Sequence, residues 1–383
     1  MCGDTLSDTS ASALTEKPFL TGAEVCEVVA SMAAKYDHLI QYSTSVENVE
    51  TLEDGQGVKL TLRREEVDGT DTWYTETFDH LVVATGHNTV PRVPDVPGLN
   101  LWRGNLRHAT WWRSGEDLKD QRVFIVGNSE SAIDIVLQSL PHVRGDIYVS
   151  RKSDHPRYPA VFKRPGVKEV TTIARFEEDT IYLDDGTVVK DIDTVIFATG
   201  YFYTHPFLSN VRPQEKTGGF RVPGLYQHIF DIHNPDAIAF VGVANVTLTW
   251  LAWEKAAFLA ALHWSGKLTL PEKHTMLEWE ARRLEDKGSK RFHAMDLPYE
   301  RVAYFDELNE LANDVLLQCF PFEWVVELIG TRGWKLEKYG LTEDSLYGRV
   351  GGRRGQLGAG IFSRGSGADT GGDESDGPDA EGL

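Results

Sequence analysis

The stretch VFIVGNSESAID, Val123 to Asp134, decides the fold of this chain. It combines an apolar strand, a turn that begins at a glycine, and a helix, which is the order in which a dinucleotide-binding unit begins. Two strand endings of one form enclose it, LVVATG at 81–86 and VIFATG at 195–200. This layout predicts an α/β fold in which one nucleotide-binding domain is inserted into another.

Shorter patterns predict the elements around these units. A polar hairpin with Asp-Gly at its tip precedes each ATG strand, at 58–77 and at 180–189. We also expect a short strand at 39–43 and a strand that returns to the first sheet at 237–243. Apolar residues at helical spacing predict further helices at 21–36, 250–264, 277–287 and 306–317.

The composition limits the class of protein and its partners. The chain has 383 residues, a length that suits two α/β domains better than one core. Its 39 basic and 58 acidic residues give a net charge of -19, which argues against nucleic acid or an anionic membrane surface as a partner. The cysteines Cys2, Cys26 and Cys319 form neither a disulfide framework nor a zinc spacing. We expect a cytoplasmic protein without a membrane span, and the sequence does not indicate its oligomeric state.

The turn after the central strand is the first candidate binding site. Gly127 permits the tight turn, Ala132 is small enough for close packing of helix on strand, and the helix N-terminus offers free N–H groups to a pyrophosphate. Ser129 adds bulk where a glycine usually lies, although its hydroxyl could bond a phosphate oxygen. The alternative is a plain strand-to-helix turn without a ligand. The candidate cofactor-binding residues of this turn are Gly127, Asn128, Ser129, Glu130, Ser131 and Ala132.

The end of the next strand indicates which dinucleotide binds. About twenty residues beyond the glycine, a carboxylate is typical of NAD sites and a basic group of NADP sites. Here Ser150, Arg151 and Lys152 occupy that place. They favour NADP, with Ser150 and Arg151 as candidate ligands, although exposed charges without a ligand are the other interpretation.

Three motifs resemble those of the flavin-containing monooxygenases. The most specific is Trp102-x-Gly104-x-x-x-His108-x-x-x-Trp112, in the place of the family's fingerprint F-x-G-x-x-x-H-x-x-x-(F/Y). The others are FATGY at 197–201, followed by HPFL, and LYQHIF at 225–230. The resemblance extends from about Pro18 to Tyr304. The final Trp112 is also typical of the related Baeyer–Villiger monooxygenases, whereas Asp134 and the Gly200-Tyr201 ending fit the flavin-containing group better.

The resemblance implies FAD and NADP as cofactors. NADPH would reduce FAD, and the reduced flavin would trap dioxygen as a C4a-hydroperoxide that oxygenates a soft nitrogen or sulfur atom of a small-molecule substrate. Retained NADP⁺ would shield this species, so Gly127, Ser129, Ser131 and Arg151 would serve catalysis as well as binding. Since the cofactor carries the chemistry, no protein residue is a certain catalyst. His108 is either a structural histidine at the domain hinge, together with Trp112, or a direct participant.

The front of the chain departs from the family pattern. Family members begin with a strand, a G-x-G-x-x-G turn and a helix that hold the FAD diphosphate, and no such motif precedes Gly86. We therefore expect an incomplete FAD domain with unpaired strand edges. Three readings stay open: an incomplete copy of a true monooxygenase, which we favour, a non-catalytic NADP-binding module, and an intact enzyme whose leader replaces the unit. The residues expected to face FAD are Val46, Thr85, Gly86, Thr199, Gly200 and Tyr201.

Composition and motif order divide the chain into parts, with a Pro-rich connector at 91–98 as the hinge. The expected parts are a flexible leader at 1–17, the first FAD-type part at 18–100, the inserted NADP-binding domain at 101–198, the second FAD-type part with a helical region at 199–344, and a disordered tail at 345–383.

Overall fold

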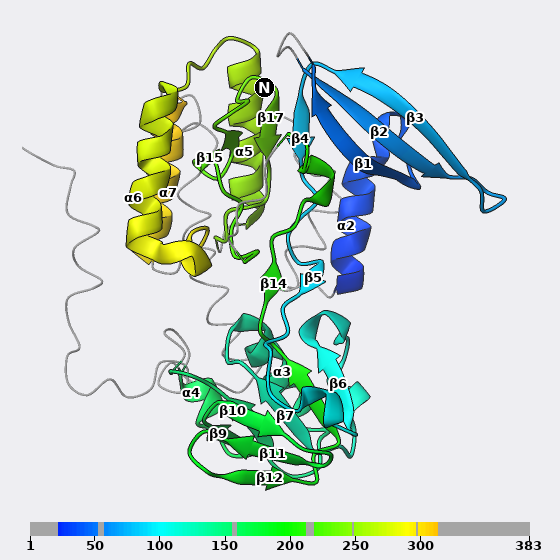
Figure 1. Cartoon of the computed structure of the whole chain (residues 1–383), viewed down its shortest axis with the longest axis vertical. Coiled ribbons are helices and arrows are strands. Elements are labelled where there is room, and N and C mark those ends of the chain that lie inside the picture. Colours follow the sequence, from blue (N-terminus) through cyan, green and yellow to red (C-terminus); the bar gives the residue numbers. More distant parts are fainter. Residues whose placement is uncertain are drawn as a thin grey trace, which may run out of the picture.

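The computed structural model describes residues 22–52, 57–154, 159–211, 218–246, 249–295 and 298–312. These residues form two lobes, and Figure 1 shows the middle of the chain in one lobe and the segments before and after it in the other. The middle of the chain is thus inserted into a second unit, as the two ATG strand endings predict. The leader expected at 1–17 and the tail expected at 345–383 lie outside the described residues.

The inserted lobe is built on a five-stranded parallel sheet with the order β6-β13-β7-β8-β9. The strands are β6 (Asn105–His108), β7 (Val123–Val126), β8 (Ile147–Ser150), β9 (Val167–Val170) and β13 (Thr194–Phe197). In a parallel sheet all carboxyl ends meet at one edge, which is where nucleotides bind in folds of this class. The predicted NADP-binding residues follow β7 and β8 and therefore lie at this edge.

Both faces of the parallel sheet are covered, which explains why β7 is apolar throughout. Val123 and Ile125 pack with helix α3 (Glu130–Ser139) in one core cluster, whereas Phe124 points to the other face and packs with a second cluster. The short helix α4 (Pro159–Phe162) adds Phe162 to the first cluster. The second cluster includes side chains from the antiparallel strands β10 (Ile173–Phe176), β11 (Thr180–Leu183) and β12 (Val188–Lys190).

The other lobe contains a sheet with the order β15-β16-β17-β4, in which β4 and β17 are parallel neighbours. Its strands are β4 (Leu81–Val83), β15 (Leu225–Tyr226), β16 (Phe230–Asp231) and β17 (Ile238–Phe240). Among the described residues β4 pairs only with β17, so its second edge carries no strand in this part of the structure. Val82 on β4 is 43% exposed.

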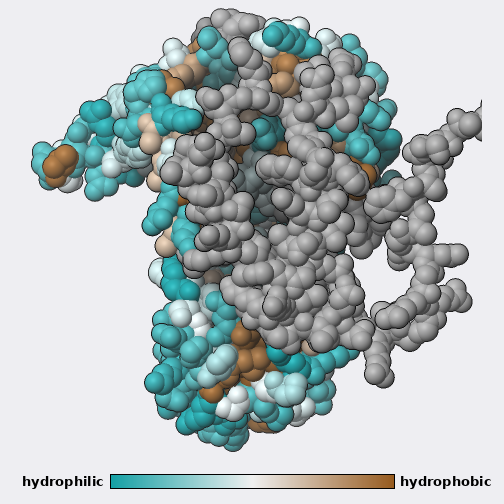
Figure 2. Space-filling view, turned by 180° about the vertical axis from the view of Figure 1, so that it is seen from behind, coloured by the Kyte–Doolittle hydropathy of each residue, from teal (hydrophilic) through white to brown (hydrophobic). Residues whose placement is uncertain are grey.

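A three-stranded antiparallel sheet, made of β1 (Thr44–Thr51), β2 (Val58–Glu65) and β3 (Asp71–Phe78), projects from this lobe (Figure 1). Strands β2 and β3 pair from Val58 opposite Phe78 to Glu65 opposite Asp71, which confirms the first predicted hairpin. Strands β11 and β12 pair around Asp185-Gly186 and confirm the second. Figure 2 shows mainly hydrophilic side chains on the visible face of the projecting sheet, as expected for a solvated hairpin.

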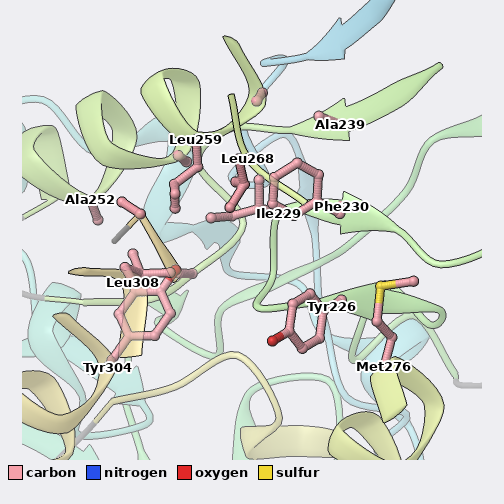
Figure 3. Close-up of a cluster of buried hydrophobic side chains, with 14 of the residues drawn as sticks. Tyr226, Ile229, Phe230, Ala239, Ala252, Leu259, Leu268, Met276, Tyr304 and Leu308 are labelled. Carbon is pink, nitrogen blue, oxygen red and sulfur yellow. The ribbon is translucent and has the colours of Figure 1, made fainter. Parts of the chain in front are cut away.

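Three helices complete the second lobe: α5 (Thr249–Trp264), α6 (Lys273–Arg291) and α7 (Pro298–Leu311). The helices expected at 250–264 and 277–287 are confirmed, and the one expected at 306–317 begins earlier and is described as far as Leu311. Leu259 of α5 and Leu308 of α7 are fully buried with Phe230 of β16 in one cluster (Figure 3). None of the described helices combines the length and the apolar character that a bilayer crossing requires.

One predicted strand is wrong. Residues 39–43 do not form a strand, because Leu39 closes a 3-10 helix (Asp37–Leu39) and the first strand begins at Thr44. The apolar side chains that suggested a strand lie on the surface, with Leu39 70% exposed. The preceding helix α2 (Gly22–Ala34) forms as predicted, yet it buries none of its side chains.

Candidate functional site

The turn after β7 depends on a glycine with two separate constraints. Gly127 has φ +104°, and a Cβ at this position would lie 2.6 Å from the carbonyl oxygen of Ala198. Its N–H donates to the Ser150 carbonyl at 2.8 Å. The turn is therefore wedged between the strand ends of β8 and β13, where no side chain fits.

Helix α3 (Glu130–Ser139) starts directly after this turn. Ser129 is the N-cap residue in an extended conformation, and its hydroxyl makes no capping hydrogen bond to the helix. Ser129, Glu130 and Ser131 are exposed, whereas Ala132 is fully buried against the sheet. Asn128 donates from Nδ2 to the Ser153 carbonyl at 2.8 Å, which ties the turn to the loop after β8. The first N–H groups of a helix have no acceptor within the helix, so this helix start and the Ser129 hydroxyl, which makes no capping bond, suit a pyrophosphate.

The end of β8 is more heavily engaged than the sequence indicates. The Ser150 hydroxyl is buried and donates to the Thr171 carbonyl at 3.0 Å, so it is used inside the fold. The Arg151 guanidinium contacts two carboxylates, Glu169 on β9 and Asp154 in the following loop. Lys152 is exposed. Glu169 was not predicted as a site residue, because it becomes a neighbour only through the pairing of β8 with β9.

The second ATG turn connects the two lobes. Strand β5 (Val90–Pro91) pairs with β14 (Tyr201–Phe202) directly after it. Thr199 and Arg92 exchange two hydrogen bonds, one from the Thr199 hydroxyl to the Arg92 carbonyl and one from the Arg92 guanidinium to the Thr199 carbonyl. The Gly200 carbonyl accepts from the Arg92 N–H at 2.9 Å and from His108 Nε2 at 3.0 Å.

His108 has a neutral side chain fixed by two backbone contacts. Its Nδ1 accepts from the Thr110 N–H at 3.2 Å, so the proton lies on Nε2 and is donated to the Gly200 carbonyl. The ring is 5% exposed and packs edge-on against Tyr201. Burial lowers the pKa of His108, and the Arg92 charge lowers it further. This geometry places His108 at the connection between the lobes and occupies both of its ring nitrogens.

The other fingerprint residues are engaged in packing. Trp102 is 8% exposed and meets Phe176 edge-on, with ring centroids 5.5 Å apart. A Cβ on Gly104 would lie 2.7 Å from the Trp102 indole nitrogen, so only glycine leaves room for the indole. Trp112 packs against the core cluster between α3 and the parallel sheet. The spacing of Trp102 and Gly104 thus has a direct steric reason.

A second candidate site lies at the carboxyl ends of β4 and β17. The turn residues Thr85 and Gly86 are exposed, and open space surrounds the position where a Cβ on Gly86 would be. His87 bonds through Nδ1 to the Gly242 carbonyl after β17 at 3.0 Å and stacks on Tyr203 at 4.7 Å. Because a carbonyl oxygen only accepts, Nδ1 donates this hydrogen bond, and burial lowers the pKa of His87. His87 was not among the predicted site residues, although its place directly after the ATG turn was a signal.

The described residues supply only part of an FAD site. Thr85 and Gly86 stand at strand ends suited to a nucleotide, and Val46 on β1 is partly buried against the adjoining core cluster. Among the described residues, however, the sheet of β4 and β17 contains no strand, glycine turn and helix in succession that would hold a diphosphate. The candidate NADP site is therefore more complete among the described residues than the candidate FAD site.

A cavity of about 280 Å³ lies elsewhere, between α6 and α7. Much of its charged lining is engaged, since Lys287 contacts Glu300 and Glu307 accepts a hydrogen bond from Gln227 at 2.8 Å. Arg283 donates to the Phe292 carbonyl at 2.7 Å. The cavity adjoins no strand end, so it does not belong to either cofactor site.

Comparisons with known proteins identify the family. The family model described as pyridine nucleotide-disulphide oxidoreductase matches residues 4–223, and the one described as flavin-binding monooxygenase-like matches residues 157–320. Trimethylamine monooxygenase from Roseovarius sp. (strain 217) is 31% identical over 292 residues, which are 75% of this chain and 63% of that relative. The chain belongs to the flavin-containing monooxygenase family. The resemblance inferred from the motifs is confirmed.

This member of the flavin-containing monooxygenase family spans only part of the length of the curated relatives that it matches. Senecionine N-oxygenase from Tyria jacobaeae is 32% identical over 213 residues, which are 53% of this chain and 44% of that protein. The chain thus matches 63% of the trimethylamine monooxygenase and 44% of the senecionine N-oxygenase.

Solved structures confirm the fold. S-allyl-L-cysteine S-oxygenase from Allium sativum superposes with a TM-score of 0.63 at 24% identity, covering 76% of this chain and 66% of that one. Cyclohexanone monooxygenase from Rhodococcus sp. Phi1, bound to NADP⁺, superposes with a TM-score of 0.55 at 13% identity, covering 79% and 86%. At these identities the likeness shows the fold alone, which is the predicted α/β architecture.

Proposed function

We propose that this chain acts as an NADPH- and FAD-dependent monooxygenase that transfers one oxygen atom from dioxygen to a soft nitrogen or sulfur atom of a small molecule. The observation that carries the proposal is the β7–Gly127–α3 turn with Arg151 at the next strand end, in a chain whose family includes proteins named N- and S-oxygenases. Cytoplasmic location and the domain limits at 18–100, 101–198 and 199–344 are part of the same proposal.

The chain's own residues would bind and orient the cofactors. Gly127 and the N-terminus of α3 would hold the NADP pyrophosphate, with the hydroxyls of Ser129 and Ser131 as further donors. Arg151 would contact the 2′-phosphate. His108 would hold the Gly200 carbonyl in place without touching substrate. When bound, the two cofactors supply the hydride and the activation of oxygen.

Only some of the residues predicted to face FAD would be available to contact it. Thr85 and Gly86 lie at the end of β4, while Thr199, Gly200 and Tyr201 lie at the connection between the lobes. Of these, Gly200 uses its carbonyl for the fold, which leaves the Tyr201 ring and the exposed Thr85 side chain for contact. Val46 would contribute an apolar contact near the adenine.

A second candidate function is a non-catalytic NADP-binding module. The observation that favours it is the lack of a diphosphate-binding turn for FAD among the described residues. A Baeyer–Villiger oxidation is the remaining alternative for an active enzyme, and the likeness to cyclohexanone monooxygenase bears on the fold alone.

The test measures cofactor binding and turnover on the purified chain. Calorimetric titration should show binding of NADP⁺, and titration with FAD separates the enzyme from the module. Where FAD binds, it should support NADPH oxidation that increases with trimethylamine or a dialkyl sulfide. Formation of the N-oxide or sulfoxide, measured by mass spectrometry, supports the monooxygenase. Binding of NADP⁺ without binding of FAD supports the module, and lactone formation from a cyclic ketone would support the Baeyer–Villiger alternative.

A further inference from the structure

The guanidinium of Arg151 is held by two carboxylates. Its Nε lies 2.5 Å from Oε1 of Glu169, and its Nη2 lies 3.0 Å from Oδ1 of Asp154. The Arg151 and Glu169 side chains are only 26% and 16% exposed, so the pair is partly shielded from solvent. The backbone fixes the arrangement further, because the Arg151 N–H donates to the Val170 carbonyl at 3.0 Å.

These contacts leave part of the guanidinium available. The group carries five N–H donors in a planar fork, and the two ion pairs lie at Nε and Nη2, although the Nε N–H itself makes no hydrogen bond within the described residues. Nη1 is the nitrogen that neither contact uses. A phosphate that approaches Arg151 can therefore bind this open side, but it does so next to the Glu169 carboxylate.

The charges around Arg151 are nearly balanced. Asp154 is also 3.4 Å from the ammonium of Lys163, and Lys152 is exposed beside the pair. Arg151 and Lys163 thus contact the two carboxylates, which leaves a much weaker field for a phosphate than three unpaired cations would give. A dianionic 2′-phosphate is repelled by Glu169, whereas the 2′-hydroxyl of NAD is a suitable donor to a carboxylate at this strand end.

We propose that Glu169 is a specificity-determining residue that narrows the preference of this site for NADP over NAD. It does so by competing with the 2′-phosphate for Arg151 and by placing a negative charge beside it. The inference rests on the proposed NADP site at β7 and β8 and goes beyond it, because Glu169 lies on a third strand. It predicts that the wild-type chain prefers NADP over NAD less strongly than a chain in which Arg151 is not paired with Glu169.

The variant Glu169→Gln removes the charge and keeps the size and an acceptor oxygen. We expect it to bind NADP⁺ about two- to fivefold more tightly in calorimetric titrations, the effect of one partly screened ion pair, with NAD⁺ binding unchanged or weaker. In the Arg151→Ala background the same change should have a smaller effect, because the competition for Arg151 is gone.

Glu178→Gln is the matched control. Glu178 pairs with Arg103 at 2.8 Å in the same lobe, but Arg103 precedes β6 and so lies at the opposite edge of the parallel sheet. This control should leave both affinities unchanged. Weaker NADP⁺ binding in Glu169→Gln, or an equal gain for NAD⁺, would overturn the inference. A wild-type chain that binds neither dinucleotide would instead overturn the proposed function, and the inference with it.

Discussion

Replacing Gly127 by alanine tests whether the nucleotide turn requires close backbone contact. Gly127 has φ +104°, and a Cβ would lie 2.6 Å from the Ala198 carbonyl oxygen. This oxygen belongs to the backbone after β13, so it cannot rotate away as a side chain would. The strained backbone conformation costs about 1–2 kcal/mol and overpacking adds about 1–3 kcal/mol. We therefore expect Gly127→Ala to lower the free energy of unfolding of the inserted lobe by about 2–5 kcal/mol.

Gly145→Ala separates the two contributions. Gly145 has φ +78°, lies in the same lobe before β8, and has no atom within 4 Å of the position of a Cβ. It should lose only the conformational part, about 1–2 kcal/mol. Urea unfolding followed by circular dichroism measures both variants. Equal losses of stability in the two variants would refute the contact with Ala198 as the reason for the glycine. Unchanged NADP⁺ affinity in folded Gly127→Ala would show that this turn does not contribute to NADP⁺ binding.

The remaining predictions concern one arginine, one histidine and one pair of histidines. Arg151→Ala should weaken NADP⁺ binding by about 1–3 kcal/mol while NAD⁺ binding changes little, and equal losses in calorimetry would contradict a contact with the 2′-phosphate. His108→Phe keeps a ring but removes the N–H donated to Gly200, so it should lower stability by about 1–3 kcal/mol, and unaltered urea midpoints would argue against this bond. His228 and His293 are bonded Nδ1 to Nδ1 at 2.9 Å, and burial lowers the pKa of both well below the ordinary value. The folded state thus binds fewer protons than the unfolded state, so stability is full above about pH 6.5 and falls by up to ~1.4 kcal/mol per pH unit and histidine below it. His228→Asn, which tolerates the positive φ of 60° at this position, should reduce that slope, and a slope equal to wild type would contradict the assignment.

The parts of the fold that could be predicted from sequence are those with local signals. The β7–α3 unit combines an apolar strand, Gly127 and a helix with period 3.6 within twelve consecutive residues. At the hairpin tips Asp68-Gly69 and Asp185-Gly186, two consecutive residues are enough to predict the turn. Where the signal was only an apolar run, as at 39–43, the prediction failed, because Leu39 finds no partner strand and lies exposed in a 3-10 helix.

The parts that could not be predicted are contacts between distant residues. His87 and Gly242 are 155 positions apart, and their hydrogen bond depends on β4 and β17 becoming neighbours. Glu169 reaches Arg151 because β8 and β9 pair in one particular register, which a single sequence does not reveal. The charge at the strand end was therefore read as a free arginine, whereas the structure contains an ion pair.

The Gly200 carbonyl gives the histidine of the fingerprint a physical role. It accepts one hydrogen bond from Arg92, which belongs to the connector between the lobes, and one from His108, which ends β6 of the inserted lobe. A carbonyl has two lone pairs, so both acceptor sites are filled and the turn is fixed from both sides. Because β14 begins directly at Tyr201, any rotation of the inserted lobe must move this turn or break one of the two bonds. We therefore expect position 108 to require a donor on Nε2 for the geometry of the connection rather than for proton transfer.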